Sequence, residues 1–293
     1  MERRLWRKVY RLIQKLHRQT AQQERTSGVI YGDIQILAML MWAVVHERPQ
    51  QWVCEPLNWP WMPRAWPGLP SASQIKIRQF SRRLRSPQIQ ALLNRLEQTI
   101  RERWPEEWCV VVDGKPLPVG GFTKDPEATI GYGAGAFYRG YKLHAVWGIG
   151  PIPWAWDVLS ANVSEPTTAS EIVASVPGEG YLLGDAAYDS NPLYRAAARV
   201  GRMLIAPRKK PHTGLGKGTR HHPHRLRSIE LTEHPILHPF ANGLHNWRTW
   251  IERQFGWLTG GVGGLQNLPT FVRRRSRVKR WVQAKLILHA LAT

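Results

Sequence analysis

Three acidic residues stand at positions where a carboxylate can do chemistry. Asp113 follows the β-branched run 109–112, Asp185 follows the apolar run 180–184, and Glu252 lies within a helical pattern. An unpaired carboxylate at the end of a buried strand is costly, so it usually caps a helix, pairs with an arginine or binds a cation. Carboxylate ligands with little His or Cys favour hard cations such as Mg²⁺ or Mn²⁺, and two such ions can activate a water against a phosphodiester. Taken singly, Asp113 is equally well explained as a turn residue before Gly114, and Asp185 as a polar loop residue.

The helical pattern around Glu252 strengthens the case for a site. Residues 244–258 have the spacing of an amphipathic helix, whose packing stripe consists of Leu244, Trp247, Ile251, Phe255 and Leu258. A neighbouring stripe carries His245, Arg248 and Glu252. Because Arg248 precedes Glu252 by four residues, the less favourable order for a helical ion pair, local stability is a weak reason for this pair. The alternative is a solvated helix face without a function.

Three other features are weaker candidates. Asp189 lies near the second acid, but the following Ser-Asn-Pro favours a helix start over a metal ligand. Four histidines suggest zinc, yet no cysteine lies nearby and their spacing fits no standard module, so a DNA-contacting or disordered basic loop is favoured. These histidines are His212, His221, His222 and His224. The glycine-rich run 131–135 lacks the Lys-Ser/Thr of a phosphate loop, so nucleotide binding is not expected.

The elements that must position these residues change character near residue 104. Before it the spacing predicts four helices. The first has an apolar stripe from Leu5 to Leu16, and the second runs from an Asp33 N-cap to about His46. The third runs from Ser71 or Ser73 to about Arg85, with Ile77, Phe80 and Leu84 facing the core, and the fourth from Pro87 to about Ile100. After it we expect strands over 109–113, 141–149, 152–159, 180–185 and 203–206, and helices over 165–175, 192–200 (capped by Asn191), 244–258 and 277–291. Residues 207–243 show no clear period.

Length, composition and charge limit the function. A chain of 293 residues is long enough for two domains of about 100–200 residues each. Its 41 Lys+Arg against 21 Asp+Glu leave a net charge of +20, which favours a polyanionic partner and makes an acidic-substrate or lectin-like function a poor fit. Two cysteines exclude a disulfide framework and any Cys-rich zinc module.

No targeting or membrane signal is evident at the sequence level. The first 20 residues have no uninterrupted apolar region, although an Arg-rich mitochondrial presequence stays open. The longest apolar run, Ile34–Val45, is well short of the roughly 20 residues that cross a bilayer. We therefore expect a soluble cytoplasmic protein without a membrane partner.

The basic residues are clustered. Seven Lys/Arg and no acid fall within 208–227, and seven more with no acid fall within 273–285. A solvated face is the ordinary explanation of a charge run, but runs without compensating acids favour contacts with DNA phosphates, which supply affinity and register. Sequence recognition is better assigned to the expected helix 73–85, which could enter a major groove.

Four motifs in order carry a resemblance to a known family. They are Val111-Val-Asp-Gly114, Gly140-Tyr-Lys-Leu-His144, Leu183-Gly-Asp-Ala-Ala-Tyr-Asp-Ser190 and Arg248-Thr-Trp-Ile-Glu-Arg-Gln-Phe-Gly-Trp257. Over about 105–293 the chain resembles bacterial insertion-sequence DDE transposases, and the helical part resembles their N-terminal region more loosely. The resemblance implies a catalytic triad of Asp113, Asp185 and Glu252, with Arg248 matching the helical signature. His245 stands where the family usually has Tyr, and Thr259 where it usually has Lys.

The resemblance also implies a fold and an activity. We expect a helical DNA-binding domain over 1–104 and a ribonuclease H-like mixed sheet flanked by helices over 105–293, with a basic insertion at about 207–243. The expected function is metal-dependent cleavage at transposon ends and strand transfer, with two Mg²⁺ or Mn²⁺ ions held by the three acids. The expected partner is double-stranded DNA, on which the protein would assemble as a homodimer, associated with the bacterial nucleoid. The residues expected to contact DNA are Arg78, Arg82, Arg83, Lys142, Arg208, Lys209, Lys210, Arg273, Arg274 and Arg275. The alternatives are a catalytically inactive DNA-binding protein or repressor and, less well suited to the helical half, another ribonuclease H-like nuclease such as a junction resolvase.

Overall fold

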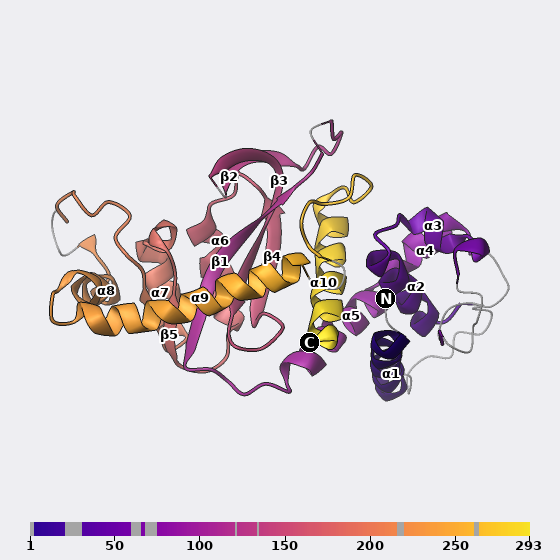
Figure 1. The fold of residues 1–293 in the computed structure, drawn as a ribbon, viewed down its shortest axis with the longest axis horizontal. Helices are drawn as coiled ribbons and strands as arrows, with labels where there is room; N and C mark the ends of the chain where they lie inside the picture. The colour runs from indigo at the N-terminus through magenta and orange to yellow at the C-terminus, as the bar shows by residue number, and fades with distance from the viewer. Residues whose placement is uncertain are drawn as a thin grey trace. The chain divides into compact units, whose positions relative to one another are not determined.

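The chain divides into two compact units. The computed structural model describes residues 3–20, 31–59, 66–67, 75–120, 122–133, 135–215, 220–260 and 264–293 (Figure 1). The helical unit comprises Met1–Arg103, Gly260–Leu265 and Arg280–Thr293, and the α/β unit comprises Trp104–Thr259 and Gln266–Lys279. The last helix is thus shared between the units, whereas the sequence pattern placed it wholly with residues 105–293. No helix in the described ranges is long and apolar enough to cross a membrane.

The helical unit is built from amphipathic helices around one buried helix. Its helices are α1 (Arg3–Thr20), α2 (Asp33–Val45), α3 (Gln50–Cys54), α4 (Ile77–Leu84) and α5 (Pro87–Arg101). The apolar stripe of α1 is buried and its cations are exposed, as predicted, while α2 is buried from Ile36 to Val44. Ser86 caps α5, because its Oγ accepts a hydrogen bond from the Ile89 N–H at 3.4 Å.

Two details of this unit differ from the sequence-based expectation. Gly32, not Asp33, is the N-cap of α2, and the Asp33 carboxylate instead pairs with Arg83 at 2.5 Å. Ile77 is exposed because it begins α4, so that Phe80 and Leu84 alone form the buried face of this helix. The expected caps Ser71 and Ser73 lie outside the described residues.

The α/β unit contains one mixed sheet. Its strands are β1 (Cys109–Pro118), β2 (Thr129–Gly133), β3 (Ala136–Trp147), β4 (Ala155–Ser160), β5 (Gly180–Leu183) and β6 (Arg202–Ile205). The order is β2-β3-β1-β5-β6, with β4 also paired to β3. β1, β2 and β4 each run antiparallel to β3, whereas β1, β5 and β6 run parallel to one another.

Helices cover both faces of this sheet. They are α6 (Glu165–Ile172), α7 (Asn191–Arg199), α8 (Pro223–Glu233), α9 (His238–Gly260) and the first turn of α10 (Arg275–Ala292). Val146 lies in a core with residues of α6 and α7, while its neighbour Trp147 packs against Phe255 of α9 with ring centroids 5.5 Å apart. Because successive strand residues face opposite sides, α9 crosses the face opposite to α6 and α7 (Figure 1). Antiparallel strands followed by parallel strands, with helices on both faces, confirm the expected ribonuclease H-like fold.

Several element boundaries in the α/β unit were predicted wrongly. β1 does not end at Asp113: its parallel pairing with β5 stops at Val111, but antiparallel pairing with β3 continues to Pro118. The region 207–243, where no helix was expected, contains α8 and the beginning of α9. The sequence carries no clear signal for α8 because its buried residues, Ser228, Ile229 and Leu231, do not follow a clear helical period. α7 is capped by Ser190 instead of Asn191.

The start of β5 gives a test of the sheet. Gly180 has a φ of 120°, and a Cβ atom there would lie 2.1 Å from the Trp108 carbonyl oxygen. Gly180→Ala should therefore lower the free energy of unfolding by about 1–3 kcal/mol, through backbone strain and overpacking. Gly256→Ala is the matched control, since nothing lies within 4 Å of that helical position; it should raise stability by about 0.5–1 kcal/mol. Chemical denaturation measures both, and equal effects would contradict the described close approach.

Candidate active site

The pairing of two parallel strands brings Asp113 and Asp185 to neighbouring positions. Val111 of β1 is the register partner of Leu183 of β5. Asp113 lies two residues after Val111 and Asp185 two residues after Leu183, so both acids lie just beyond the point where the parallel pairing of β1 with β5 ends. Their carboxylates are close enough for the charge of Asp185 to raise the pKa of Asp113. The two acids expected from separate motifs therefore belong to one site.

Helix α9 supplies the other two expected residues. Arg248 Nη2 lies 3.9 Å from Asp185 Oδ2 and 3.6 Å from Glu252 Oε1, so the guanidinium bridges a strand-end acid and a helical acid. The Glu252 side chain is 57% exposed and that of Asp185 is 36% exposed. Among the described residues, no group of three or more His, Cys, Asp or Glu side chains is arranged to hold a metal ion. Arg248 thus links two of the three expected acids, Asp185 and Glu252.

Asp113 carries a charge that its surroundings compensate poorly. Its Oδ1 accepts a hydrogen bond from the Gly114 N–H at 2.7 Å. Burial raises the pKa of Asp113 to about 6, against the lowering effects of that hydrogen bond and of Arg248, while the charges of Asp185 and Glu165 raise it further. Such a carboxylate gains from any additional cation that approaches it.

Asp185 also has a local structural role. Its Oδ1 accepts a hydrogen bond from the Ala187 N–H at 2.7 Å and caps the short 3₁₀ helix Ala186–Tyr188. The other carboxylate oxygen faces Arg248. The structure therefore shows the polar-loop role for one oxygen of Asp185 and leaves the other oxygen beside Arg248.

Two residues near Asp113, Glu165 and Tyr188, were not recognised as site residues from the sequence, and Lys142 was expected to contact DNA instead. Glu165, the first residue of α6, forms an ion pair with Lys142. Both side chains lie beside Gly114, where a Cβ atom would come within 3.1 Å of Lys142 Cδ and 3.5 Å of Glu165 Oε1. Tyr188 is fully buried, and its pKa is raised above the ordinary value by burial and by the charges of Glu165, Asp113 and Asp185. The sequence signals for this cluster were the Gly140–His144 motif, which contains Lys142, and the Leu183–Ser190 motif, which contains Tyr188.

The predicted DNA-contacting residues fall into two groups. Lys142 does not fit the expectation: its side chain is buried, pairs with Glu165 and donates to the Tyr132 carbonyl at 3.1 Å. Three arginines are engaged with acids: Arg83 with Asp33, Arg208 with Glu233, and Arg275 with Asp157. The remaining residues are exposed, namely Arg78, Arg82, Lys209, Lys210, Arg273 and Arg274.

The weaker candidates have structural roles in the described part of the chain. Asp189 pairs with Arg225, His222 caps α8 through its ring, and His221 hydrogen-bonds to Arg225 and to the Leu215 carbonyl. Residues 131–133 belong to β2 and pair with β3, which is not the strand-to-helix setting of a phosphate loop.

The raised pKa of Asp113 predicts a pH-dependent stability. Between pH 4 and pH 6 the carboxyl ionises in the unfolded chain but resists ionisation in the folded one, so stability is lost as the pH rises through this window. Asp113→Asn removes this penalty and should raise the free energy of unfolding by about 1–3 kcal/mol at pH 7.5, with no gain near pH 4. Denaturant unfolding in EDTA at both pH values measures the difference, and a gain that is equal at both would contradict the assigned cause.

Comparison with known proteins identifies the family. No curated protein and no solved structure matches the chain. A family model described as a transposase DDE domain matches residues 104–291, a range that includes β1, β5, α9 and the acids Asp113, Asp185 and Glu252. On this match and on the fold that carries the acids, the chain belongs to the family of transposases with a DDE domain.

Proposed function

We propose that this chain is an active DNA transposase that cleaves DNA at the ends of its element and joins the freed 3′-OH to target DNA. One observation carries the proposal: the Val111–Leu183 register sets Asp113 beside Asp185, and Arg248 links Asp185 to Glu252. Three acids that are separated by 72 and 67 residues gather at the carboxyl edge of the parallel strands, where open α/β sheets bind their ligands.

The donor set fits divalent metal ions, which transposases of this family generally use. All candidate ligands are carboxylates, the oxygen donors that Mg²⁺ and Mn²⁺ prefer. Burial opposes the ionisation of Asp113, and the open Asp185 and Glu252 side chains can be reached from solvent. Asp113, Asp185 and Glu252 would hold two ions, which when bound supply an activated water and charge stabilisation at the phosphodiester.

The chain's own residues would orient this chemistry. In cleavage, water attacks phosphorus and the 3′-oxygen leaves; in strand transfer, that 3′-OH attacks a target phosphodiester and displaces another 3′-oxygen. Arg248 holds Asp185 and Glu252 in reach of each other, so it positions two acids from different elements. Glu165 and Lys142 pack beside Gly114 and thereby restrict the backbone that carries Asp113.

A transposase-derived repressor without catalysis is the second candidate. It is favoured by His245 and Thr259, which replace the Tyr and Lys usual at these positions. However, Thr259 Oγ1 accepts a hydrogen bond from Lys115 Nζ at 2.6 Å, so the structure retains a cation at this position of α9. The three acids are also all present. These observations favour the enzyme, which we propose acts as a homodimer when it is assembled on double-stranded DNA.

Substitution of the acids tests catalysis. Asp113→Asn, Asp185→Asn and Glu252→Gln should each reduce strand cleavage more than about 10²-fold, the scale of one catalytic group, while DNA binding is retained. The measurement is nicking of labelled duplexes that carry the ends of the encoding DNA segment, with Mg²⁺ or Mn²⁺. Glu171→Gln, at an exposed position of α6, is the charge-matched control and should cleave normally. Full cleavage by one of the three variants would remove that residue from the site, and loss of binding in all three would favour misfolding over loss of catalysis.

We further propose that α4 recognises sequence through its exposed arginines. Arg78 and Arg82 project from a helix held by Phe80 and Leu84, whereas Arg83 pairs with Asp33. Base contacts are worth roughly 1–3 kcal/mol each, so Arg78→Ala/Arg82→Ala should lower the preference for end sequences over scrambled duplexes about tenfold or more. Arg4→Ala/Arg11→Ala removes the same charge from exposed positions of α1 and should preserve the preference. Equal loss in both double variants of a competition assay would show that charge, not base contact, is responsible.

A further inference from the structure

The chain segment that carries Asp185 also anchors the basic segment 208–227. We propose that Asp189 and Arg225 are positioning residues: their buried ion pair holds residues 208–215 and 220–227, the parts of this segment that the structure describes, in a fixed arrangement, with the exposed cations of Lys209, Lys210 and Arg220 available to the DNA backbone. The proposal rests on the proposed DNA-binding function and assigns to two residues a role that the catalytic chemistry does not require.

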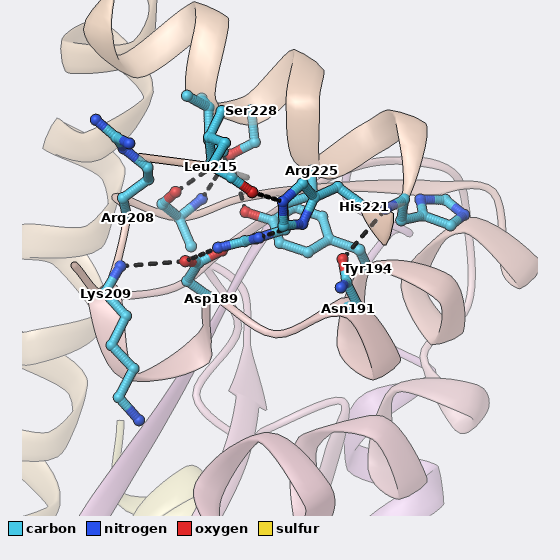
Figure 2. Close-up of polar contacts among 12 residues, drawn as sticks. Asp189, Asn191, Tyr194, Arg208, Lys209, Leu215, His221, Arg225 and Ser228 are labelled. Atoms are coloured by element: carbon cyan, nitrogen blue, oxygen red, sulfur yellow. Dashed lines mark hydrogen bonds and ion pairs between the residues drawn. The ribbon is translucent and has the colours of Figure 1, made fainter. Parts of the chain in front are cut away.

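Both carboxylate oxygens of Asp189 accept hydrogen bonds from the protein. Its side chain is 1% exposed, and its oxygens accept hydrogen bonds from Arg225 Nε and Nη2, each at 2.7 Å (Figure 2). Asp189 Oδ2 also accepts a hydrogen bond from the Lys209 backbone N–H at 3.1 Å. Burial alone would raise the pKa of Asp189, but the contacts with Arg225 and Lys209 lower it below the ordinary value. One buried carboxylate therefore ties the beginning of the basic segment to α8.

Two more side chains, His221 and Asn191, contact the backbone at residues 215, 220 and 222. His221 lies between Arg225 Nη1 and the Leu215 carbonyl oxygen, with ring nitrogens 2.6 Å from each. Accepting from Arg225 and donating to a carbonyl requires the neutral ring with its proton on Nε2. Asn191 donates to the Arg220 carbonyl and accepts from the His222 N–H, both at 3.1 Å. We call Asp189, Asn191, His221 and Arg225 the anchor network.

The anchor network leaves cationic side chains unused. Lys209 contributes only its backbone N–H, and Figure 2 shows its side chain pointing away from Asp189. Lys210 and Arg220 are also exposed. Backbone that the anchor network already fixes at residues 209 and 220 avoids the conformational entropy cost that a free loop would pay when it binds phosphates. The anchor network therefore places the cations of Lys209, Lys210 and Arg220 for phosphate binding before DNA arrives.

The network is continuous with the catalytic edge of the sheet. Asp185 caps the 3₁₀ helix Ala186–Tyr188, and Asp189 is the residue that ends it. One short turn thus places a carboxylate toward Arg248 and α9 at its beginning, and a carboxylate toward Arg225 and α8 at its end. A DNA strand held by the basic segment would consequently be held by the same turn that positions Asp185.

Asp189→Asn tests this role because charge and position predict opposite results. The substitution removes a negative charge, so electrostatics alone would strengthen DNA binding. Loss of the anchor should instead weaken DNA binding. The slope of log affinity against log salt concentration should become shallower by about two to three, because each phosphate contact of Lys209, Lys210 and Arg220 contributes roughly 0.9 to it. The measurement is fluorescence anisotropy of the full chain with an arbitrary duplex in EDTA across a salt series.

Two further variants separate anchoring from charge and from misfolding. Arg227→Gln removes one exposed cation of α8 that pairs with Glu230, and should change the slope by at most about 0.9. Asn191→Ala is neutral and removes only the two hydrogen bonds to residues 220 and 222; it should reproduce part of the Asp189→Asn effect. Trypsin should cut faster after Lys209 and Arg220 in both anchor variants, while their thermal unfolding remains cooperative.

The outcomes distinguish the two proposals. Salt-dependent wild-type binding that is unchanged or strengthened in both Asp189→Asn and Asn191→Ala would overturn the positioning role alone. Wild-type affinity that does not depend on salt would overturn the DNA-binding function together with it. Weaker binding and a shallower slope in both variants, beyond the Arg227→Gln effect, would support the anchor network.

Discussion

The register between the parallel strands β1 and β5 is the constraint on which the candidate site depends. It brings Asp113 close to Asp185, and burial raises the pKa of Asp113, to which repulsion from the charge of Asp185 adds. Arg248 offsets part of this repulsion from a helix that crosses the sheet face, and Lys142 pairs with the further acid Glu165. The packing of Phe255 against Trp147 is therefore more than core formation, because it fixes the helix that delivers the compensating charge.

Two acids four residues apart show how geometry separates a carboxylate that solvent can reach from a buried, paired one. Asp189 is buried, meets Arg225 in a two-point ion pair and has a lowered pKa. Asp185 uses one oxygen as a helix cap and leaves the other 3.9 Å from Arg248, where solvent also has access. The Asp189 carboxylate is buried against its partners, whereas the second oxygen of Asp185 can be reached from solvent. Residue type alone does not distinguish them, since both follow the same strand.

The net charge of +20 overstates the surface available to DNA. Arg202 is buried and donates to the Glu107 carbonyl at 3.0 Å, and Lys285 is buried and pairs with Glu47 at 2.7 Å. The run 273–285 is consequently not one exposed basic surface: its later part lies in the helical unit and serves packing. The exposed cations that remain are concentrated in shorter segments, which makes the ordering of each segment important.

The sequence by itself determined the elements whose signals are local. The 3.6-residue period of α1, the β-branched run of β1 and the Ser-Pro start of α5 each specify an element from neighbouring residues, because each pattern selects one buried face or one cap. The motifs around Asp113, Asp185 and Glu252 likewise identified the acids before their proximity was known. Tertiary structure alone decided the partners: Arg225 meets Asp189 across 36 residues, Lys142 meets Glu165 across 23, and β1 continues to Pro118 only because β3 pairs with it. These outcomes depend on which segments the folded sheet brings together, and no local period encodes a contact between side chains that are distant in the chain.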